Sequence, residues 1–327
     1  MAKESSAAII NLTGVIVAVT NEVPRVLVVD HGDECMLPNG HFDPASHASL
    51  EEGFRSLIEA QAGLDLYYIE QLYTFGNRYR DPTEIEGGPR VISVAYIALT
   101  HENPVASEHI RWADWYRFLP WEDWRGGRPA MIEEIIEPAL ECWAQRVQNP
   151  HRKIRQERIN VTFGNSDSVE MDAVLSLERF ELLYEAGVVS EAQRDARAIS
   201  GVSDKKSGAS LGEEKGVPMA SDHRRILATA LGRLRGKLAY RPVVFELLPG
   251  EFTLLQLQRV AEALSGARIH KQNFRRLVAN ADLVEPVGRT TAVSRGRPAE
   301  LFRFRREVLG ERLTVGLSRP IMRIGNT

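Results

Sequence analysis

The chain has 327 residues, of which 43% are apolar and 26% charged, fractions typical of a soluble protein with room for two domains. Its net charge of −3 hides an asymmetry, because residues 221–306 hold 17 Lys/Arg and 7 Asp/Glu while the rest sums to −13. The only cysteines, Cys35 and Cys142, exclude a disulfide framework and a cysteine-based zinc site, and no apolar run reaches transmembrane length. We therefore expect a cytoplasmic protein, without membrane contact, that touches nucleic acid through one basic module.

Residues 1–149 combine strand and helix patterns and predict a mixed α/β domain. β-branched and apolar segments predict strands at 8–20, 25–30, 64–75, 90–99 and 113–119. A helix is expected from about Ser46 to Gln61, ended by Gly63, and a second over 129–147 with a kink at Pro138. Between the strands, Leu37-Pro38-Asn39-Gly40 and the polar segment 77–89 are expected to be loops.

Three segments of different composition follow. Residues 150–199 predict a helical connector, with a helix at 169–186 that Gly187 ends. Residues 200–221 are rich in Gly and Ser with few large apolar side chains, a composition that predicts a flexible linker. Residues 222–327 form the C-terminal domain, which opens with a basic helix at 223–238.

The C-terminal domain has the element order of a winged helix-turn-helix. Thr253 and Gln256 have the spacing of a capping box at the start of a helix that Gly266 ends. A second helix at 269–280 follows, and then two strands, at 283–287 and 301–305, that flank a basic loop. The fold class predicted for the whole chain is therefore α+β.

The basic charge of this domain predicts a DNA partner. Residues 268–306 contain ten Lys/Arg and three Asp/Glu, and neutralisation of phosphates supplies most non-specific DNA affinity. Arg, Asn and Gln on an exposed recognition helix also read base edges. The predicted DNA contacts are Lys271, Asn273, Arg275 and Arg276 on the second helix, and Arg289, Thr290, Arg295 and Arg297 in the wing. The alternative is a small α/β domain with a solvated cationic face.

The N-terminal domain resembles a Nudix domain. Leu37-Pro38-Asn39-Gly40 stands where that family has Leu-Pro-Gly-Gly, and Leu50-Glu51-Glu52 opens the following helix as in the Nudix box. The positions of the family's Arg-Glu-x-x-Glu-Glu, whose carboxylates hold the metal, fall on Ser56, Leu57, Ala60 and Gln61. A register shifted by one residue recovers Arg55 and Glu59 but leaves Ser56 and Ala60 in place of carboxylates. Too few carboxylates remain to hold a metal against a pyrophosphate, so we expect no catalytic residues and no hydrolysis.

The whole chain resembles the Nudix-related transcriptional regulators of NAD metabolism, the NrtR-like proteins, and is most similar to their alphaproteobacterial NadQ type. The segments that carry this resemblance are 177–187, 252–258, 273–276 and 296–298, together with the degenerate Nudix box. It implies a homodimer that represses NAD biosynthesis genes from a palindromic operator, with NAD, ADP-ribose or ATP as effector and no required cofactor. Two alternatives stay open: a Nudix-type nucleotide pyrophosphatase with an unusual metal site, and a nucleotide-binding adaptor whose winged helix binds protein.

Chemistry suggests the contacts to such an effector. Arg55, Arg78 and Arg80 suit phosphates, and an aromatic ring such as Phe75 or Tyr96 suits an adenine, next to the Asn39-Gly40 loop. Tyr73 and Trp115 are further candidate rings. A core position for Tyr73 and Tyr96, which lie on predicted strands, and an ion pair of Arg80 with Asp81 are the alternatives. Since a flexible linker transmits force poorly, we expect the effector to act through dimer geometry, moving two recognition helices off their one-turn spacing and releasing DNA.

Overall fold

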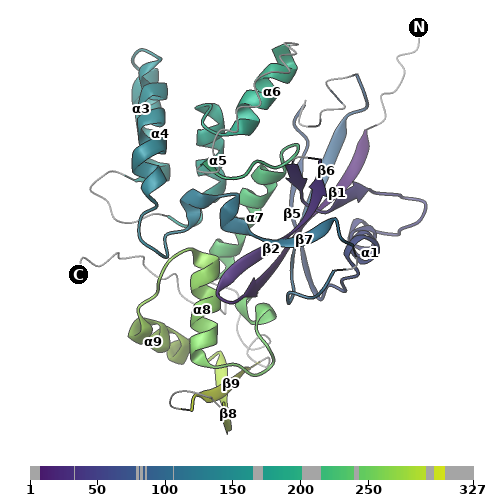
Figure 1. The fold of residues 1–327 in the computed structure, drawn as a ribbon, viewed down its shortest axis with the longest axis vertical. Coiled ribbons are helices and arrows are strands. Elements are labelled where there is room, and N and C mark those ends of the chain that lie inside the picture. The colour runs from purple at the N-terminus through teal and green to yellow at the C-terminus, as the bar shows by residue number, and fades with distance from the viewer. Residues whose placement is uncertain are drawn as a thin grey trace.

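The computed structural model describes residues 8–32, 34–78, 81, 84, 87–105, 107–164, 172–200, 215–238, 243–291 and 298–305. Figure 1 shows a strand-rich N-terminal part, a group of helices beside it, and a small module of helices and a hairpin at the C-terminal end. The predicted α+β class is confirmed. Among the described helices, none combines the length and apolar character that crossing a bilayer would require.

The N-terminal domain is built on one seven-stranded sheet. Its main order is β3-β2-β1-β6-β5, with β4 paired to β1 and β7 to β2. The strands are β1 (Ile9–Thr20), β2 (Val23–His31), β3 (Glu34–Met36), β4 (Asn39–His41), β5 (Tyr68–Phe75), β6 (Val91–Leu99) and β7 (Ile110–Asp114). The central strands β1 and β6 are parallel, and their near-continuous apolar sequences reflect burial on both faces of the sheet.

Two sequence predictions fail at strand ends. The strand expected at 113–119 stops at Asp114, because its carboxylate accepts a hydrogen bond of 2.9 Å from the Tyr116 backbone N–H and starts the 3-10 turn η1 (Trp115–Arg117). The loop expected over Leu37–Gly40 is only partly a loop, because Asn39 and Gly40 pair with β1 as the first residues of β4.

Helices cover both faces of the sheet. Helix α1 (Leu50–Ala62) packs Phe54 and Ile58 on one face, against side chains that include Tyr96. The helical connector and α7 cover the other face, where Ala95 and Ile97 point. Successive strand residues alternate between faces, so neighbours in β6 serve different cores.

The helix expected over 129–147 is divided. A π-helical turn, η3 (Ile132–Ile136), precedes α3 (Glu137–Gln145), and the Glu137 N–H bonds back to the Ile132 carbonyl. Pro138, which has no N–H to donate, follows directly after this π-helical turn, in the first turn of α3. The irregularity that the sequence placed at Pro138 thus takes the form of a π-helical turn just before it.

The connector contains α4 (His151–Phe163), α5 (Ser176–Glu185) and α6 (Ser190–Ser200), followed by α7 (His223–Leu238). Of the helix expected at 169–186, residues 169–171 lie outside the described residues, and α5 begins at Ser176. The helix predicted at 223–238 is confirmed, but it packs on α5, β1 and β5 as well as on α8. Helix α7 thus contacts both the N-terminal sheet and the C-terminal module.

The flexible linker predicted at 200–221 is wrong for its last residues. Met219 is fully buried and forms an isolated parallel β-bridge with Cys35 of β3, and the Ala220 N–H donates to the Cys35 carbonyl at 2.9 Å. Residues 201–214 lie outside the described part of the chain. Composition misled here because an extended segment needs only a few apolar side chains to pack against a sheet edge.

The C-terminal module contains η5 (Val243–Leu247), α8 (Leu254–Ser265), α9 (Lys271–Ala281), β8 (Val284–Thr290) and β9 (Glu300–Phe304). The capping box is confirmed, since Thr253 Oγ1 accepts from the Gln256 N–H at 3.2 Å and Gln256 Oε1 accepts from the Thr253 N–H at 2.8 Å. Gly266 ends α8 with a φ of 75°, as its left-handed cap requires.

We expect Thr253→Ala to lower the free energy of unfolding by about 1 kcal/mol, because the Gln256 N–H at the start of α8 loses its side-chain partner. Urea unfolding followed by circular dichroism measures the change. Thr253→Ser keeps the hydroxyl and serves as the control, and equal midpoints for the Ala and Ser variants would contradict the prediction.

Candidate DNA-binding surface and ligand pocket

Helix α9 presents a basic face to solvent. Its buried side is held by Phe274 and Val278, which are 1% and 3% exposed. Four predicted DNA contacts, Lys271, Asn273, Arg275 and Arg276, are all exposed. Lys271 is exposed at the start of the helix, and the helical period turns the other three away from the stripe that Phe274 and Val278 form.

Most other arginines of the module are neutralised by neighbouring carboxylates. The ion pairs are Arg259 and Arg268 with Glu262, Arg289 with Glu251, Arg303 with Glu285, and Arg305 with Asp282. Across the part of the chain that the structure describes, Lys271, Arg275 and Arg276 have no ion pair or side-chain hydrogen bond. The uncompensated positive charge of the described module is thus concentrated on α9.

The wing follows α9 directly. β8 and β9 pair antiparallel, with Val284 opposite Phe304 and Thr290 opposite Glu300. Arg289 and Thr290 are exposed at the end of β8, although Arg289 is paired with Glu251. The predicted wing contacts Arg295 and Arg297 lie outside the described residues.

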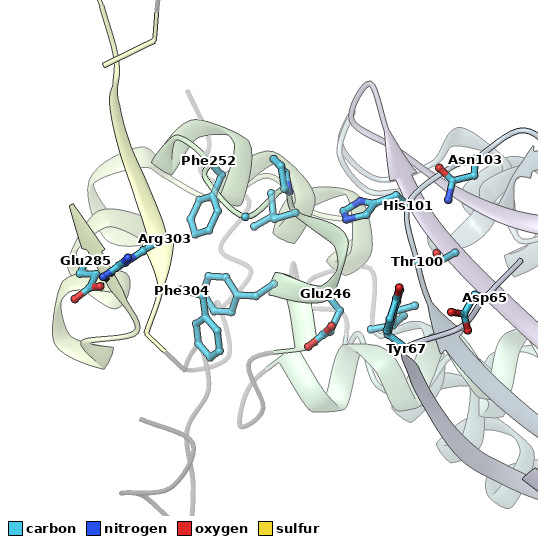
Figure 2. Close-up of a pocket in the computed structure, with 15 residues that line it drawn as sticks. Asp65, Tyr67, Thr100, His101, Asn103, Glu246, Phe252, Glu285, Arg303 and Phe304 are labelled. Carbon is cyan, nitrogen blue, oxygen red and sulfur yellow. Dashed lines mark hydrogen bonds and ion pairs between the residues drawn. The ribbon is translucent and has the colours of Figure 1, made fainter. Parts of the chain in front are cut away.

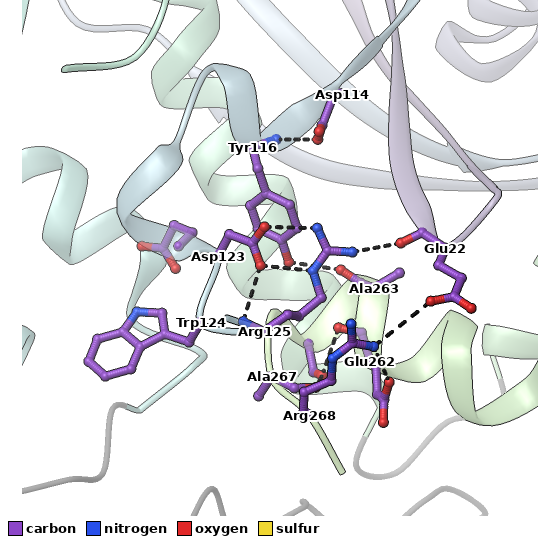
Figure 3. A network of polar contacts seen from close by, with 12 residues as sticks. Glu22, Asp114, Tyr116, Asp123, Trp124, Arg125, Glu262, Ala263, Ala267 and Arg268 are labelled. Carbon is purple, nitrogen blue, oxygen red and sulfur yellow. Dashed lines mark hydrogen bonds and ion pairs between the residues drawn. The ribbon is translucent and has the colours of Figure 1, made fainter. Parts of the chain in front are cut away.

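Glu262 fixes the turn between α8 and α9, a role that sequence reasoning missed. Its carboxylate accepts from Gln258 at 2.9 Å and from the Ile269 N–H at 3.0 Å, and it also binds Arg268, which approaches Glu22 of the sheet (Figure 3). Burial raises the pKa of Glu262, but these hydrogen bonds outweigh burial and hold it below its ordinary value. An acidic residue inside a basic module was the only available signal.

The Asn39-Gly40 segment is fixed against α1. Asn39 donates to the Leu37 carbonyl at 2.9 Å, and its own carbonyl accepts from Gln61 Nε2 at 2.9 Å. A Cβ on Gly40 would lie 2.6 Å from Leu57 Cδ1, so a larger residue here would require the Leu57 side chain of α1 to move. The segment is therefore held in place by bonds and packing within the protein.

The predicted phosphate ligands have different surroundings. Arg55 forms a pair with Glu51 at 2.8 Å and also donates to the Leu66 carbonyl, so intramolecular partners already occupy it. Arg78 is exposed just after β5, and Arg80 lies outside the described residues. A phosphate that bound Arg55 would therefore have to replace these bonds.

The predicted aromatic contacts do not form one site. Tyr96 is 4% exposed and stacks on Phe54, with ring centroids 4.7 Å apart, so it belongs to the core beneath α1. Burial raises the pKa of the Tyr96 hydroxyl, and the negative charge of Glu51 raises it further. Phe75 packs on the opposite face of the sheet, where its ring meets the 59% exposed Tyr73 edge-to-face at 5.1 Å. Tyr96 was thus the wrong choice for an adenine contact, and Tyr73 is the accessible ring.

The carboxylates of α1 serve the helix itself. Glu52 accepts from the Ala48 N–H at 2.8 Å while Ser49 caps the Glu52 N–H, and Glu51 is paired with Arg55. Glu59 is exposed one turn before the helix ends. In the described ranges, no three His, Cys, Asp or Glu side chains converge as metal ligands would.

A cleft of about 830 Å³ separates the sheet from the C-terminal module (Figure 2). Asp65, Tyr67 and His101 line it from the sheet side, and Glu246 and the wing strands line it from the other. Its carboxylates outnumber its one arginine, Arg303, which is already paired with Glu285 at 2.5 Å. The cleft therefore does not suit a phosphate-bearing ligand.

A buried ionic cluster joins the segment after β7 to helices α5 and α7. Glu122 is fully buried, receives two bonds from Arg179 at 2.6 and 2.9 Å, and also binds Arg235 of α7. Burial raises the pKa of Glu122, but Arg179 and Arg235 together outweigh burial and lower it. Nearby, the Tyr116 hydroxyl donates to the Ala263 carbonyl at 2.8 Å, at the end of α8 (Figure 3).

Comparison with known proteins agrees with this architecture. Residues 244–304 match the family described as the NrtR DNA-binding winged helix domain. The ADPR responsive transcriptional repressor NtrR of Acinetobacter baylyi is 34% identical over 88 residues, 27% of this chain and 35% of the relative, so the match spans about a third of that relative's length. The crystal structure of Shewanella oneidensis NrtR complexed with a 27mer DNA has a TM-score of 0.54 at 21% identity and covers 94% of this chain and 98% of that chain. A MutT/nudix family protein from Enterococcus faecalis has a TM-score of 0.52 at 17% identity, over 93% of this chain and 89% of that one.

Fold and surface define a protein in which a Nudix-like domain is joined to a winged helix module. Residues 244–304 are a winged helix domain of the NrtR DNA-binding type, and the chain as a whole has the NrtR fold. The predicted resemblance to NrtR-like proteins and the predicted two-domain architecture are confirmed, whereas the NadQ subtype stays a prediction.

Proposed function

We propose that this protein is a transcriptional repressor that binds operator DNA through α9 and the wing. The observation that carries the proposal is the uncompensated basic face of α9, inside a domain of the NrtR DNA-binding type. We further propose that it acts as a homodimer on a palindromic site near NAD biosynthesis genes, in the cytoplasm. A recognition helix that inserts into one major groove reads a half-site, so symmetry doubles the contact area.

Retardation of DNA fragments from upstream of this gene and of NAD biosynthesis genes tests the proposal. We expect the purified protein to shift one palindromic fragment more strongly than a scrambled fragment of equal length, with an affinity that falls steeply as salt rises. Equal affinity for both fragments would leave only non-specific charge attraction and would contradict an operator.

The Nudix-like domain is the proposed effector site, and ADP-ribose is the first candidate. The relative from Acinetobacter baylyi is named as ADPR responsive, while NAD and ATP are the alternatives. The ordered Asn39-Gly40 segment, with the exposed Arg78 and Tyr73, supports a nucleotide site at this end of the sheet.

We expect ADP-ribose to bind and to weaken operator affinity, with a coupling free energy of about 1–3 kcal/mol, as is typical of regulated sites. Calorimetry with ADP-ribose, NAD and ATP identifies the ligand, and operator titrations with and without it measure the coupling. Tight nucleotide binding with unchanged operator affinity would rule out the sensor role and leave DNA binding intact.

We also propose that the domain does not hydrolyse nucleotides and holds no metal, because Ser56, Leu57, Ala60 and Gln61 occupy the positions of the family's Arg-Glu-x-x-Glu-Glu. Incubation of the protein with ADP-ribose, NAD or ATP and either Mg²⁺ or Mn²⁺, followed by chromatography, should give no product. Metal-dependent product that disappears in Glu59→Gln would instead support the pyrophosphatase alternative.

A further inference from the structure

Helix α7 begins beside the proposed effector loop. The Leu37 backbone N–H donates to His223 Nδ1 at 2.9 Å, and both residues are buried. The carbonyl of the same Leu37 accepts the side-chain amide of Asn39 at 2.9 Å. One peptide segment is thus bonded on one side to the candidate ligand loop and on the other to the first residue of α7.

Helix α7 ends beside the DNA-binding module. Arg235 donates to the Leu264 carbonyl at 3.2 Å and to the Glu122 carbonyl at 2.9 Å, and its guanidinium is buried. Leu264 belongs to the last turn of α8, whose free carbonyls carry the negative end of the helix dipole. Gly266, the residue that caps α8, leaves no room for a Cβ between Glu122 and Arg235.

Between these ends, α7 is held rigidly on several sides. Its 16 residues span about 24 Å. Arg224 binds Glu191 of α6 at 2.8 Å, and Arg225 binds Glu181 of α5 at 2.6 Å. A Cβ on Gly232 would lie 2.6 Å from the Val174 carbonyl, so the helix packs directly on backbone there. Such a helix moves as one body rather than bending.

We propose that α7 carries the effector signal, converting a displacement of the Leu37–Gly40 loop at His223 into a displacement of α8 at Arg235. This inference rests on the proposed function and replaces the expectation that, because a flexible linker transmits force poorly, the effector acts through dimer geometry. The packed residues Met219 and Ala220 lead straight into α7, so the described chain has no slack between the sheet and this helix. Because α9 follows α8 through the turn that Glu262 fixes, a shift of α8 moves the recognition helix.

The decisive comparison is His223→Leu against His223→Asn in the full chain. Leucine removes the acceptor for the Leu37 N–H, whereas asparagine places a carbonyl oxygen near the position of Nδ1. The readout is the ratio of operator dissociation constants with and without saturating ADP-ribose, which for regulated proteins is about 5–150-fold. We expect this ratio to fall to near unity in His223→Leu and to be retained in His223→Asn. Arg233→Ala, an exposed change on α7, is the control that should also retain it.

A second measurement does not depend on the effector. Hydrogen–deuterium exchange of the unliganded protein should become faster in the last turn of α8 in His223→Leu than in His223→Asn, with exchange in α1 unchanged. Thermal unfolding of each variant establishes that it is folded. If the wild-type protein does not bind operator, or if ADP-ribose does not change its operator affinity, the proposed function is refuted. The exchange comparison still decides the role of α7 in that case. A retained ratio, or an unchanged last turn of α8 in His223→Leu, overturns the inference.

Discussion

Glu122→Ala is expected to lower the free energy of unfolding by about 3–5 kcal/mol, because it leaves buried arginines without a counter-charge. Arg179 is fully buried and Arg235 is 4% exposed, so water cannot replace the lost carboxylate. Urea unfolding followed by tryptophan fluorescence measures the change, since Trp121 and Trp124 flank the site. An exposed pair offers the matched control: Glu251→Ala, which frees Arg289, should change stability by less than about 1 kcal/mol.

The same carboxylate predicts a pH dependence. Because the folded protein lowers the pKa of Glu122, its contribution is fully present above the pKa of about 4.3 for an unfolded glutamate and is lost as pH falls through the folded value. The stability difference between wild type and Glu122→Gln should therefore shrink as pH is lowered from 7 toward 3. A difference that stays constant over this range would mean that folding does not shift the pKa of Glu122.

Truncation of Arg275 or Arg276 is expected to weaken operator binding by about 1–3 kcal/mol for each base-reading side chain. Both are exposed on α9 without a neighbouring carboxylate partner among the described residues, so their full charge is available to DNA. A residue that contacts only phosphate should instead weaken all sequences alike and reduce the slope of affinity against salt by about one ion.

Arg289→Ala is the comparison variant, because Arg289 is already paired with Glu251 and should contribute less. Fluorescence anisotropy with operator and scrambled duplexes, at several salt concentrations, separates base reading from charge. If Arg275→Ala and Arg276→Ala keep wild-type operator affinity, α9 is not the reading helix.

Local signals in the sequence predicted much of the secondary structure correctly. The Thr253 capping box, the Gly266 cap and the helix at 223–238 all appear as expected. These features depend on hydrogen bonds and backbone conformations within a few residues of each other, which the chain encodes directly. The winged helix order and the basic face of α9 followed from the same local patterns.

Charge counting could not distinguish a binding arginine from a structural one. Of the basic residues between 221 and 306, Arg224 and Arg235 are buried in pairs that hold the halves of the protein together. Arg259 and Arg268 bind Glu262 within the module. The acidic partners of Arg235 and Arg224, which are Glu122 and Glu191, lie more than 30 residues away in the sequence, and only folding brings each pair together.

The sequence by itself determined most of the elements, the α+β class and the basic recognition helix, because periodicity and capping are properties of neighbouring residues. Only the tertiary structure decided which side chains are available for binding. It placed Tyr96 beneath α1 and Phe75 on the other face, and it packed Met219 and Ala220 against β3. These outcomes depend on contacts between distant segments, where the strand alternation and the sheet edge decide which surface each residue meets.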